Sequence, residues 1–451
     1  MRTLFVVLKL IFLVSFNLNS QTTTGLISGP MLTGVELRNA VIWLEVSKNI
    51  TKVDIVYYPK ANPVLKKSQT YRGELGNEFN PIKIELNGLD INTTYAYQVR
   101  INDKEIKLPY PTEFVTKDLW QFRKPAPDFT FLTGSCSYFN QPAYDRPGKP
   151  YGEDSSIFEI MAAIPAQLHI WMGDNWYTRE VDFFTKWGLN YRASITRSQP
   201  TLQRFLASTP HYAIWDDHDY GPNNANKSYI LKDESRRVFM NYWGNPSYGE
   251  ENKGIYSKIS YSDVDFYLLD DRFFRDADEK PDSINGLPNP NKRMFGEKQL
   301  QWLENEILTS YATFKIILVG SQVLNPISKS DCLRHYPQDF NELLRIILQN
   351  KINGVLFFSG DRHQSEVIKH DRLGTYSLYD VTVSPYSAGT HKFSKLEANN
   401  PARIIGIDEK QNFGKVSVTG ERKNRILKVE FIGLRGEKLG EWSVNEKELK
   451  F

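Results

Sequence analysis

Five short motifs, far apart in this 451-residue sequence, gather the residue types that bind metal ions. Together they contain carboxylates, imidazoles, a phenol and a thiol, and most of them follow an apolar run. Such donors, brought to one place, suggest a hydrolytic site with two metal ions. The motifs are Gly134-Ser135-Cys136, Met172-Gly173-Asp174-Asn175-Trp176-Tyr177, Trp215-Asp216-Asp217-His218-Asp219, Leu269-Asp270-Asp271-Arg272 and Ser359-Gly360-Asp361-Arg362-His363.

Each motif alone also has an ordinary structural explanation. A Gly-Asp pair after a strand is commonly a turn or a helix cap, and Asp361 with His363 could be a capping pair in the same way. Residues 216–219 could form a solvated acidic loop, but the flanking Trp215 and Tyr220 favour a partly buried position. Carboxylates crowded around one imidazole repel one another and call for cations. Taken together, the motifs favour a single metal site.

The elements that would position these motifs have the pattern of a layered α/β domain. From residue 128 onward, short apolar runs alternate with amphipathic segments. Residues 414–444 return to a strand pattern, which predicts antiparallel strands added to the sheet. We expect strands at 129–133, 167–172, 212–215, 264–269, 314–319 and 354–358, and helices at 156–163, 183–195, 234–243, 296–308 and 339–349.

The residues that could do chemistry fall at the ends of these predicted strands. Ligands collect outside the carboxyl ends of the strands in an open α/β sheet, because the loops converge there. We therefore expect these residues at one edge of the sheet. The residues that follow six different strands are Cys136, Asp174 with Tyr177, Asp217 with His218, Arg272, Gln322, and Asp361 with His363.

Residues 25–116 have a different, all-β pattern. Apolar and polar residues alternate in the runs 40–46, 52–58, 82–86 and 94–100, and polar turns such as Asn87-Gly88 separate them. This pattern is typical of an antiparallel sandwich. The proline-rich segment 117–128 has the composition of a linker. We expect a β-sandwich domain at 21–117 and a catalytic domain at 128–451.

The first 20 residues have the layout of a secretory signal peptide. Arg2 is followed by an apolar run from Leu4 to Phe16, which Lys9 interrupts, and then by polar residues. Cleavage after position 20 would leave Gln21 first. The alternative, a membrane anchor, is disfavoured because a spanning helix needs about 18 apolar residues. We expect export to the periplasm or the medium, with no transmembrane anchor after signal removal.

Charge and cysteine content exclude some functions and leave others open. The 56 basic and 53 acidic side chains nearly balance, so no strong field recruits nucleic acid. Cys136 and Cys332 are the two cysteines, and in an exported protein they could form one disulfide. The favoured alternative makes Cys136 a metal thiolate and Cys332 a small buried residue. We expect a monomer.

The motif set resembles the alkaline phosphatase D (PhoD-type) family of the calcineurin-like metallophosphatase superfamily. The resemblance extends over nearly the whole chain after the signal peptide. It implies a fibronectin/Ig-like β-sandwich followed by a layered αββα metallophosphatase-type catalytic domain. It also implies an exported phosphatase or phosphodiesterase with Fe3+ and Ca2+ in a dinuclear or trinuclear site.

The same resemblance implies roles for individual residues. The thiolate and phenolate among the first ligands suit a trivalent ion, and oxygen donors at the second site suit calcium. Asp174 would bridge the two sites. The implied ferric ligands are Cys136, Asp174, Tyr177 and Asp361. The implied ligands of the second ion are Asp217 and His363, with Asn223 or Asn224 as a further oxygen donor.

Two further residues are candidates for catalysis. His218 would face the phosphoryl group and protonate the leaving oxygen or hold a transition-state oxygen. Arg272 would clamp a phosphate oxygen, or alternatively form an ordinary ion pair with Asp271 or Asp276. Ser135 lacks the Gly-x-Ser-x-Gly context of a serine nucleophile, so a loop or phosphate-contact role is favoured.

These residues predict an exported metal-dependent phosphatase that hydrolyses phosphate mono- and/or diesters of small substrates by metal-activated hydroxide. One alternative is a phosphodiesterase or phospholipase-type enzyme that acts on lipid or polymer diesters. Another is a non-catalytic exported binding protein, which the presence of Asp174 and His218 disfavours. Aromatic residues near the motifs could stack on the organic group of a substrate or pack in the core. They are Tyr138, Phe139, Tyr144, Trp176, Tyr220 and Trp243.

Overall fold

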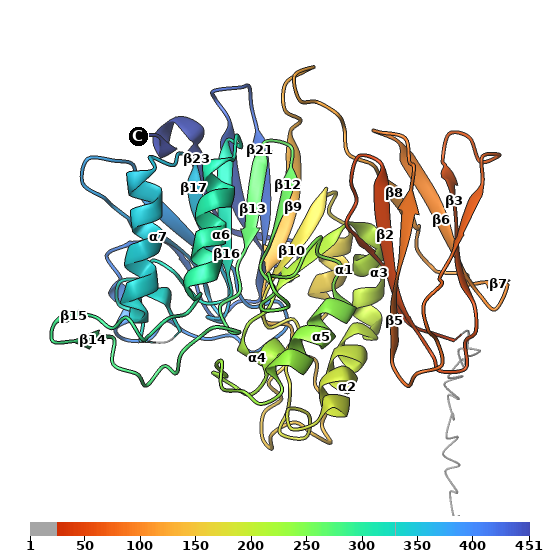
Figure 1. The fold of residues 1–451 in the computed structure, drawn as a ribbon, viewed down its shortest axis with the longest axis horizontal. Helices are drawn as coiled ribbons and strands as arrows, with labels where there is room; N and C mark the ends of the chain where they lie inside the picture. The colour runs from red at the N-terminus through yellow and green to blue at the C-terminus, as the bar shows by residue number, and fades with distance from the viewer. Residues whose placement is uncertain (1–24, 330) are drawn as a thin grey trace, which may run out of the picture.

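Two parts with separate apolar cores make up the described chain, an all-β part and a larger α/β part. Figure 1 shows them packed side by side, the first in red to orange and the second from yellow to blue. The structure is a computed structural model that describes residues 25–329 and 331–451. The predicted signal peptide at 1–20 lies outside the described residues.

The all-β part is a sandwich of two antiparallel sheets, as the alternating pattern predicts. In β6 every second side chain is buried, so one face of the strand supplies the core. One sheet contains β1 (Leu26–Thr33), β2 (Asn39–Val46) and β5 (Asn80–Asn87). The other contains β3 (Val53–Pro59), β4 (Lys67–Thr70), β6 (Thr94–Ile101), β7 (Lys104–Glu105) and β8 (Glu113–Val115).

The α/β part is built on two sheets that pack face to face. The ring of Phe131 lies 5.1 Å from that of Phe266 and 6.1 Å from that of Phe358, both in the opposite sheet. The first sheet contains, in spatial order, β11 (His211–Ile214), β10 (Leu168–Met172), β9 (Phe129–Gly134), β21 (Asn412–Thr419), β22 (Ile426–Gly433) and β23 (Lys438–Asn445). The second contains β12 (Ser257–Tyr261), β13 (Val264–Leu268), β16 (Phe314–Val319), β17 (Val355–Ser359), β19 (Leu378–Thr382), β18 (Ser365–His370) and β20 (Arg403–Ile407).

The parallel strands of each sheet end at the same edge, so the loops that follow them lie together there. β9, β10 and β11 are parallel to one another, as are β13, β16, β17 and β19. The predicted antiparallel strands in the tail are confirmed, since β21 pairs antiparallel with β9 and leads into β22 and β23. A small hairpin of β14 (Ser283–Ile284) and β15 (Leu287–Pro288) projects from the second sheet's side.

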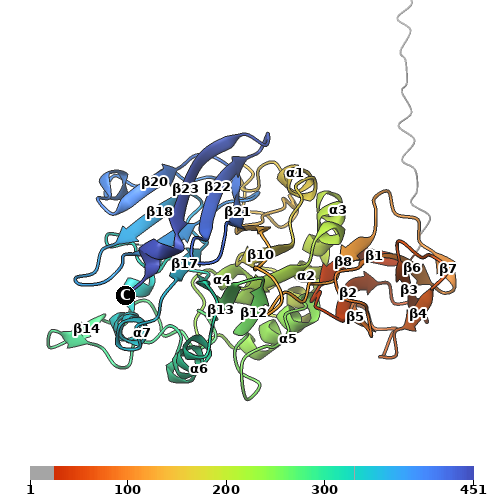
Figure 2. The same cartoon turned by 90° about the horizontal axis from the view of Figure 1, so that it is seen from above.

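Helices cover the outer faces of the two sheets. Figure 2 shows α1 and α3 on one side and α6 and α7 on the opposite side. Within the described ranges, no helix has the length and apolar character needed to cross a membrane. The helices are α1 (Ile157–Ala162), α2 (Lys186–Arg197), α3 (Pro200–Ser208), α4 (Asp217–Tyr220), α5 (Lys232–Tyr242), α6 (Glu297–Leu308) and α7 (Pro337–Gln349), with 3-10 turns at η1 (Leu333–His335), η2 (Glu397–Asn399) and η3 (Glu446–Leu449).

Helices α2 and α3 show how the structure departs from the sequence-based expectation. The helix expected at 183–195 begins at residue 186, because Thr185 caps it by accepting a hydrogen bond from Gly188 N at 2.9 Å. Helix α3 was not predicted. It is nine residues long and begins with Pro200, so its apolar period is too short to stand out.

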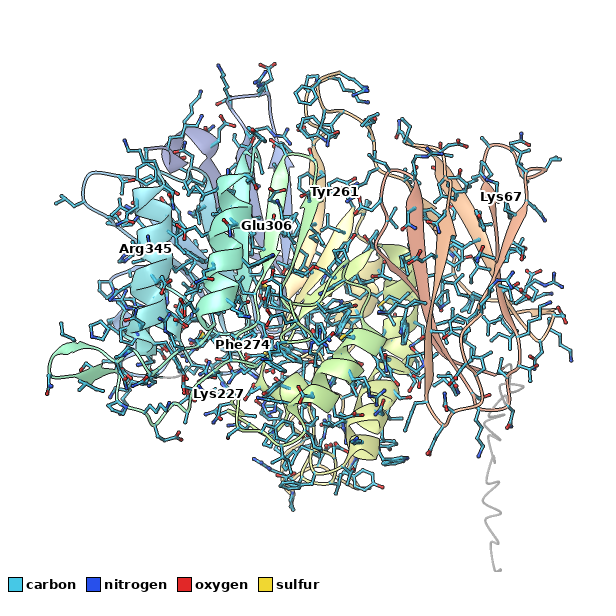
Figure 3. The ribbon with its side chains drawn as sticks, viewed as in Figure 1. Lys67, Lys227, Tyr261, Phe274, Glu306 and Arg345 are labelled. Atoms are coloured by element: carbon cyan, nitrogen blue, oxygen red, sulfur yellow. The ribbon has the colours of Figure 1, made fainter. Side chains whose placement is uncertain are left out.

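A continuous buried interface joins the sandwich to the α/β part. Met31 and Trp43 of the sandwich belong to the apolar core of the α/β part. The indole Nε1 of Trp43 donates to Asn241 O at 2.8 Å. At the boundary labelled by Tyr261 in Figure 3, the Lys117 ammonium lies 5.7 Å from that ring's centroid. These contacts, rather than the segment 117–128 alone, fix the sandwich in place.

Glu45 of β2 is a carboxyl group buried in this interface, with 1% of its surface exposed. Its Oε1 accepts a hydrogen bond from the Tyr242 hydroxyl at 2.9 Å, while its Oε2 has no hydrogen-bond partner. Burial raises the pKa of Glu45 to about 7, although hydrogen bonds from Ser194 and Tyr242 oppose the shift. The folded protein therefore disfavours the charged form of this side chain.

We predict that Glu45→Gln makes the protein's stability less sensitive to a rise in pH, because glutamine cannot ionise. The pKa of Glu45 is about 7 in the folded protein and 4.5 for an ordinary glutamate. Between these two pH values Glu45 therefore holds a proton in the folded protein that it has lost in the unfolded chain. The contribution of Glu45 to stability is therefore fully present below about pH 4.5 and falls by about 3 kcal/mol as pH rises to about 7. Urea midpoints of both proteins across this range measure the difference. Parallel pH profiles would contradict the prediction.

Candidate metal centre

The predicted ligands meet at one edge of the two stacked sheets. The loops that follow β9, β10 and β17 carry Cys136, Asp174 and Asp361, and Asp217 is the first residue of helix α4, which follows β11. Helix α4, which follows β11, marks this edge near the bottom of Figure 1. A backbone hydrogen bond from Cys136 N to Gly173 O, 3.3 Å long, ties two of these loops together. The predicted convergence of the strand ends is therefore present.

Two glycines allow the strand ends to approach closely. Gly173 has a φ of +89°, and a Cβ at this position would lie 2.7 Å from the Cβ of Asp216. A Cβ on Gly360 would lie 2.6 Å from the carbonyl oxygen of Met172. Any larger residue would push the loops apart, so the glycine of each Gly-Asp motif is a packing requirement.

Four of the predicted ligands have an unusual backbone conformation. Cys136, Asp174, Asp361 and His363 have φ angles of 64°, 53°, 65° and 55°, in the left-handed region. This conformation costs roughly 1–2 kcal/mol for a residue with a side chain. Such residues persist where the surrounding structure imposes the conformation, and they concentrate at functional sites. The fold holds these four side chains in place at a cost in stability.

Asp174 is the centre of the cluster. Its Oδ2 accepts a hydrogen bond from the Tyr177 hydroxyl at 3.0 Å and lies 3.6 Å from Cys136 Sγ. Its Oδ1 lies 3.4 Å from the backbone N of His218. The Tyr177 hydroxyl also lies 3.1 Å from His363 Nε2. A carboxylate, a phenol, a thiol and an imidazole therefore lie in mutual contact.

Three overlapping groups of side chains could each hold a metal ion. Within each group the donor atoms lie within 4.8 Å of one another. Asp174 belongs to all three groups, as a ligand that bridges two metal ions must. The groups are Cys136, Asp174 and His363; Asp174, Asp217 and His218; and Asp174, Asp216 and Asp361.

The electrostatics of the cluster fit a bound cation. Burial raises the pKa of Asp174 well above its usual range, and the neighbouring Cys136 and Asp217 raise it further. Burial and the charge of Asp331 raise the pKa of Asp361 to about 6. Burial raises the pKa of the Cys136 thiol to about 11. A multivalent cation would favour the ionised form of each group, so the donor set suits a metal centre.

A large cavity opens onto this cluster. Its volume is about 920 Å³, at the upper end of small-molecule sites. Cys136 and Tyr177 lie behind its wall, and Cys136 is fully buried. The predicted site residues that line the cavity are Asp174, Asp217, His218, Asn223, Asn224, Asp361 and His363.

Asp217 and His218 form one wall of the cavity. Burial alone would raise the pKa of Asp217, but the charges of His218 and Arg272 hold it below its usual value. The backbone N of Asn224 donates to Asp217 Oδ2 at 2.7 Å. Burial lowers the pKa of His218. Its ring stacks on that of Tyr177 with centroids 4.2 Å apart, which fixes the imidazole at the cavity wall.

Arg272 lies beneath the cavity rather than in its lining. Its side chain is fully buried, Nε donates to Asp216 Oδ1 at 2.5 Å, and Nη2 donates to Asp331 Oδ2 at 2.6 Å. No ion pair with Asp271 or Asp276 occurs among the described residues. Arg272 thus bridges two carboxylates, whereas the sequence-based expectation placed it against a phosphate oxygen.

Three residues at the site were missed by the sequence-based reasoning. Asp216 belongs to one metal-binding group, and its buried Oδ2 has no hydrogen-bond partner. Asp216 stands in the acidic motif at 216–219, and that position could have identified it as a candidate ligand. Asp331 lines the cavity from the loop after β16, and the Tyr151 hydroxyl lies 3.3 Å from His363 Nδ1. Neither stands in a motif, so local sequence carried no signal for them.

The structure also bears on the alternatives raised for other residues. Cys136 and Cys332 are both free and buried. Ser135 is fully buried, and its Oγ donates to Val383 O at 3.1 Å, so it does not face the cavity. Among the aromatic residues near the motifs, Tyr138 borders a second cavity. The residues Trp176, Tyr220 and Trp243 are core side chains.

Comparison with known proteins identifies the family. The model of the PhoD-like phosphatase family matches residues 131–423, more than half of the chain. A second family model, described as a domain of unknown function (DUF7800), matches residues 23–118. The two matches correspond to the α/β part and to the sandwich.

Individual relatives agree with this result. Alkaline phosphatase D of Bacillus subtilis (strain 168) is 22% identical over 337 residues, which cover 63% of this chain and 53% of that protein. The chain therefore spans about half the length of this curated relative. A solved structure of PhoD has a TM-score of 0.71 and 16% identity, covering 94% of this chain and 90% of that chain, so the two folds are alike. The chain belongs to the PhoD-like phosphatase family.

Proposed function

We propose that this protein is a metal-dependent phosphoesterase that hydrolyses phosphate mono- and diesters. The observation that carries the proposal is the position of Asp174, which three potential metal-binding groups share at the edge of a cavity of about 920 Å³. Membership of the PhoD-like phosphatase family and similarity to an alkaline phosphatase D support the same chemistry. The substrate is a phosphate ester small enough to enter this cavity.

We further propose iron and calcium as the metals. Cys136, Tyr177, Asp174 and Asp361 supply a thiol, a phenol and two carboxylates, and anionic donors of this kind suit a trivalent ion. On the other side of Asp174, Asp217 and the neighbouring asparagines supply oxygen donors that suit calcium. When bound, such ions supply positive charge that stabilises the phosphoryl transition state and makes a water molecule acidic enough to attack.

The chain's own residues orient the reaction. Hydrolysis breaks the bond between phosphorus and the ester oxygen and forms a new bond from phosphorus to the oxygen of water. The leaving oxygen then needs a proton. In this proposal His218, which stacks on Tyr177 at the cavity wall, donates that proton.

Arg272 acts in this proposal as a positioning residue. Its hydrogen bonds to Asp216 and Asp331 hold the loops after β11 and β16 together from beneath the cavity. Its guanidinium also lies 3.9 Å from Asp217 Oδ1, which keeps that carboxylate ionised. It thereby orders one side of the cavity without touching the substrate.

We predict that Asp174→Asn lowers kcat/KM for a chromogenic phosphomonoester by about a thousandfold or more. The amide lacks the charge that a bridging ligand contributes, and metal-ion catalysis is worth several kcal/mol. A chelator should abolish turnover by the unmodified protein, and added iron and calcium should restore it. The ratio of monoester to diester hydrolysis assigns the substrate class.

The matched control for this experiment is Asp371→Asn, which removes an exposed carboxylate in the turn between β18 and β19. It should retain full activity and metal content. Full activity in Asp174→Asn, or turnover that a chelator leaves unchanged, would refute the metal-dependent mechanism.

We predict that His218→Asn slows esters with poor leaving groups by about a hundredfold or more and esters of p-nitrophenol much less. A general acid matters most when the leaving oxygen is basic, and its removal typically costs this factor. Activity against an alkyl and a p-nitrophenyl ester, with metal content measured in parallel, tests the role. Loss of bound metal in the variant would instead identify His218 as a ligand, which its place in one metal-binding group allows.

We also propose that the protein is exported, on the pattern of Arg2, the apolar run 4–16 and the polar segment 17–20. Export predicts a mature protein that begins at Gln21. The intact mass of protein recovered from outside the cytoplasm of an expressing bacterium measures this. A protein that retains Met1 and stays entirely in the cytoplasm would contradict the proposal.

A further inference from the structure

A second, smaller cavity of about 300 Å³ adjoins the metal centre on the side of His218. We call it the side cavity. It shares Tyr151, His218 and Asn223 with the main cavity, so the two cavities adjoin at these residues. Tyr177 borders the side cavity, and its hydroxyl reaches Asp174. The mechanism proposed above makes no use of this space.

Four aromatic rings line the side cavity, beside charged side chains that include Arg146, Lys149 and Glu180. The ring of Tyr138 lies 5.1 Å from that of Tyr151 and 5.0 Å from that of Tyr177, both edge to face. Phe183, from the loop between β10 and α2, adds a fourth ring. The aromatic part of this lining favours a flat apolar group, which can stack on one ring and meet others by its edges.

Hydrogen bonds and ion pairs hold this aromatic wall in place. The guanidinium of Arg179 lies 4.0 Å from the centroid of Tyr138, and its Nη2 donates to Asp145 Oδ1 at 3.0 Å and to Phe139 O at 2.9 Å. The Tyr138 hydroxyl donates to the same Asp145 oxygen at 2.8 Å. The charges beneath the wall are paired with each other, so the site is organised before any ligand binds.

The position of His218 indicates which part of a phosphate ester would enter the side cavity. In phosphoryl transfer the attacking and leaving oxygens lie roughly in line on opposite sides of phosphorus. His218 would protonate the leaving oxygen, and it stands where the two cavities meet. An ester bound with its phosphoryl group at the metal centre and its leaving oxygen at His218 would therefore extend its organic group into the side cavity.

We propose that the side cavity binds the alcohol part of the substrate and that this part is an aromatic ring. The proposal rests on the proposed function, and it assigns a specificity-determining role to Phe183, Tyr138 and Tyr151. Phe183 is the most useful of these to test, because Tyr151 contacts His363 and Tyr138 contacts Tyr177.

The test compares Phe183→Ala with Val181→Ala. Val181 lies two residues earlier in the same loop, is 56% exposed and does not line the side cavity. For each purified, metal-loaded protein, kcat/KM is measured for phenyl phosphate and for ethyl phosphate, together with inhibition by inorganic phosphate. In Phe183→Ala the ratio of phenyl to ethyl phosphate should fall by roughly threefold to tenfold, the value of one aromatic contact.

Phosphate inhibition should stay unchanged in both variants, since the phosphoryl site is untouched, and Val181→Ala should keep the original ratio. A second variant, Phe183→Trp, fills the side cavity and should slow naphthyl phosphate far more than ethyl phosphate. Unchanged ratios in both Phe183 variants, or equal losses for all esters, would overturn the side-cavity assignment. Failure of the unmodified, metal-loaded protein to hydrolyse any ester would overturn the proposed function itself.

Discussion

The gathering of buried acidic groups around Asp174 is the constraint on which the rest of this structure depends. Carboxylates repel one another and lose hydration when they are buried together, so a fold can hold them only with strong compensation. The glycines at 173 and 360 let the strand ends approach, and the left-handed backbone at four ligand positions aims the donors. Each feature alone lowers the free energy of unfolding, and each helps to bring the acidic groups around Asp174 together.

The protein's own cations compensate part of this charge, and the proposed metal ions would compensate the rest. Arg272 binds Asp216 and Asp331, and Arg275 also binds Asp331 with Nη2 2.9 Å from Oδ1. Asp174 and Asp361 form no ion pair with any described residue. Asp216 and Asp331 are thus paired with arginines. Asp174 and Asp361 have no such partner among the described residues, and their charge is left for the proposed metal ions to compensate.

The sandwich contributes to this arrangement through the edge of the first sheet. β11 is the outermost strand of that sheet and leads directly into the loop that carries Asp217. Thr33 Oγ1 of the sandwich donates to His211 O at 3.0 Å, and Asn245 exchanges hydrogen bonds with the backbone of Ala213. An unpaired edge strand is otherwise free to twist or to pair elsewhere. Packing of the sandwich therefore steadies one of the loops that build the site.

The sequence by itself determined the class of fold and the order of most elements. It also determined the strand ends at which the candidate ligands Asp174 and Asp361 lie, because the apolar period and the motifs at strand ends are local properties. Only the tertiary structure decided that Arg272 faces Asp216 and Asp331, that Tyr151 approaches His363, and that a second cavity adjoins His218. Helix α3 also escaped prediction, since its short apolar period is stabilised by packing against β1 and α1. The physical reason is the same in each case. The chain's local pattern reports which face of an element is buried, but the partner of a buried charge comes from segments far away in the sequence, and packing alone selects it.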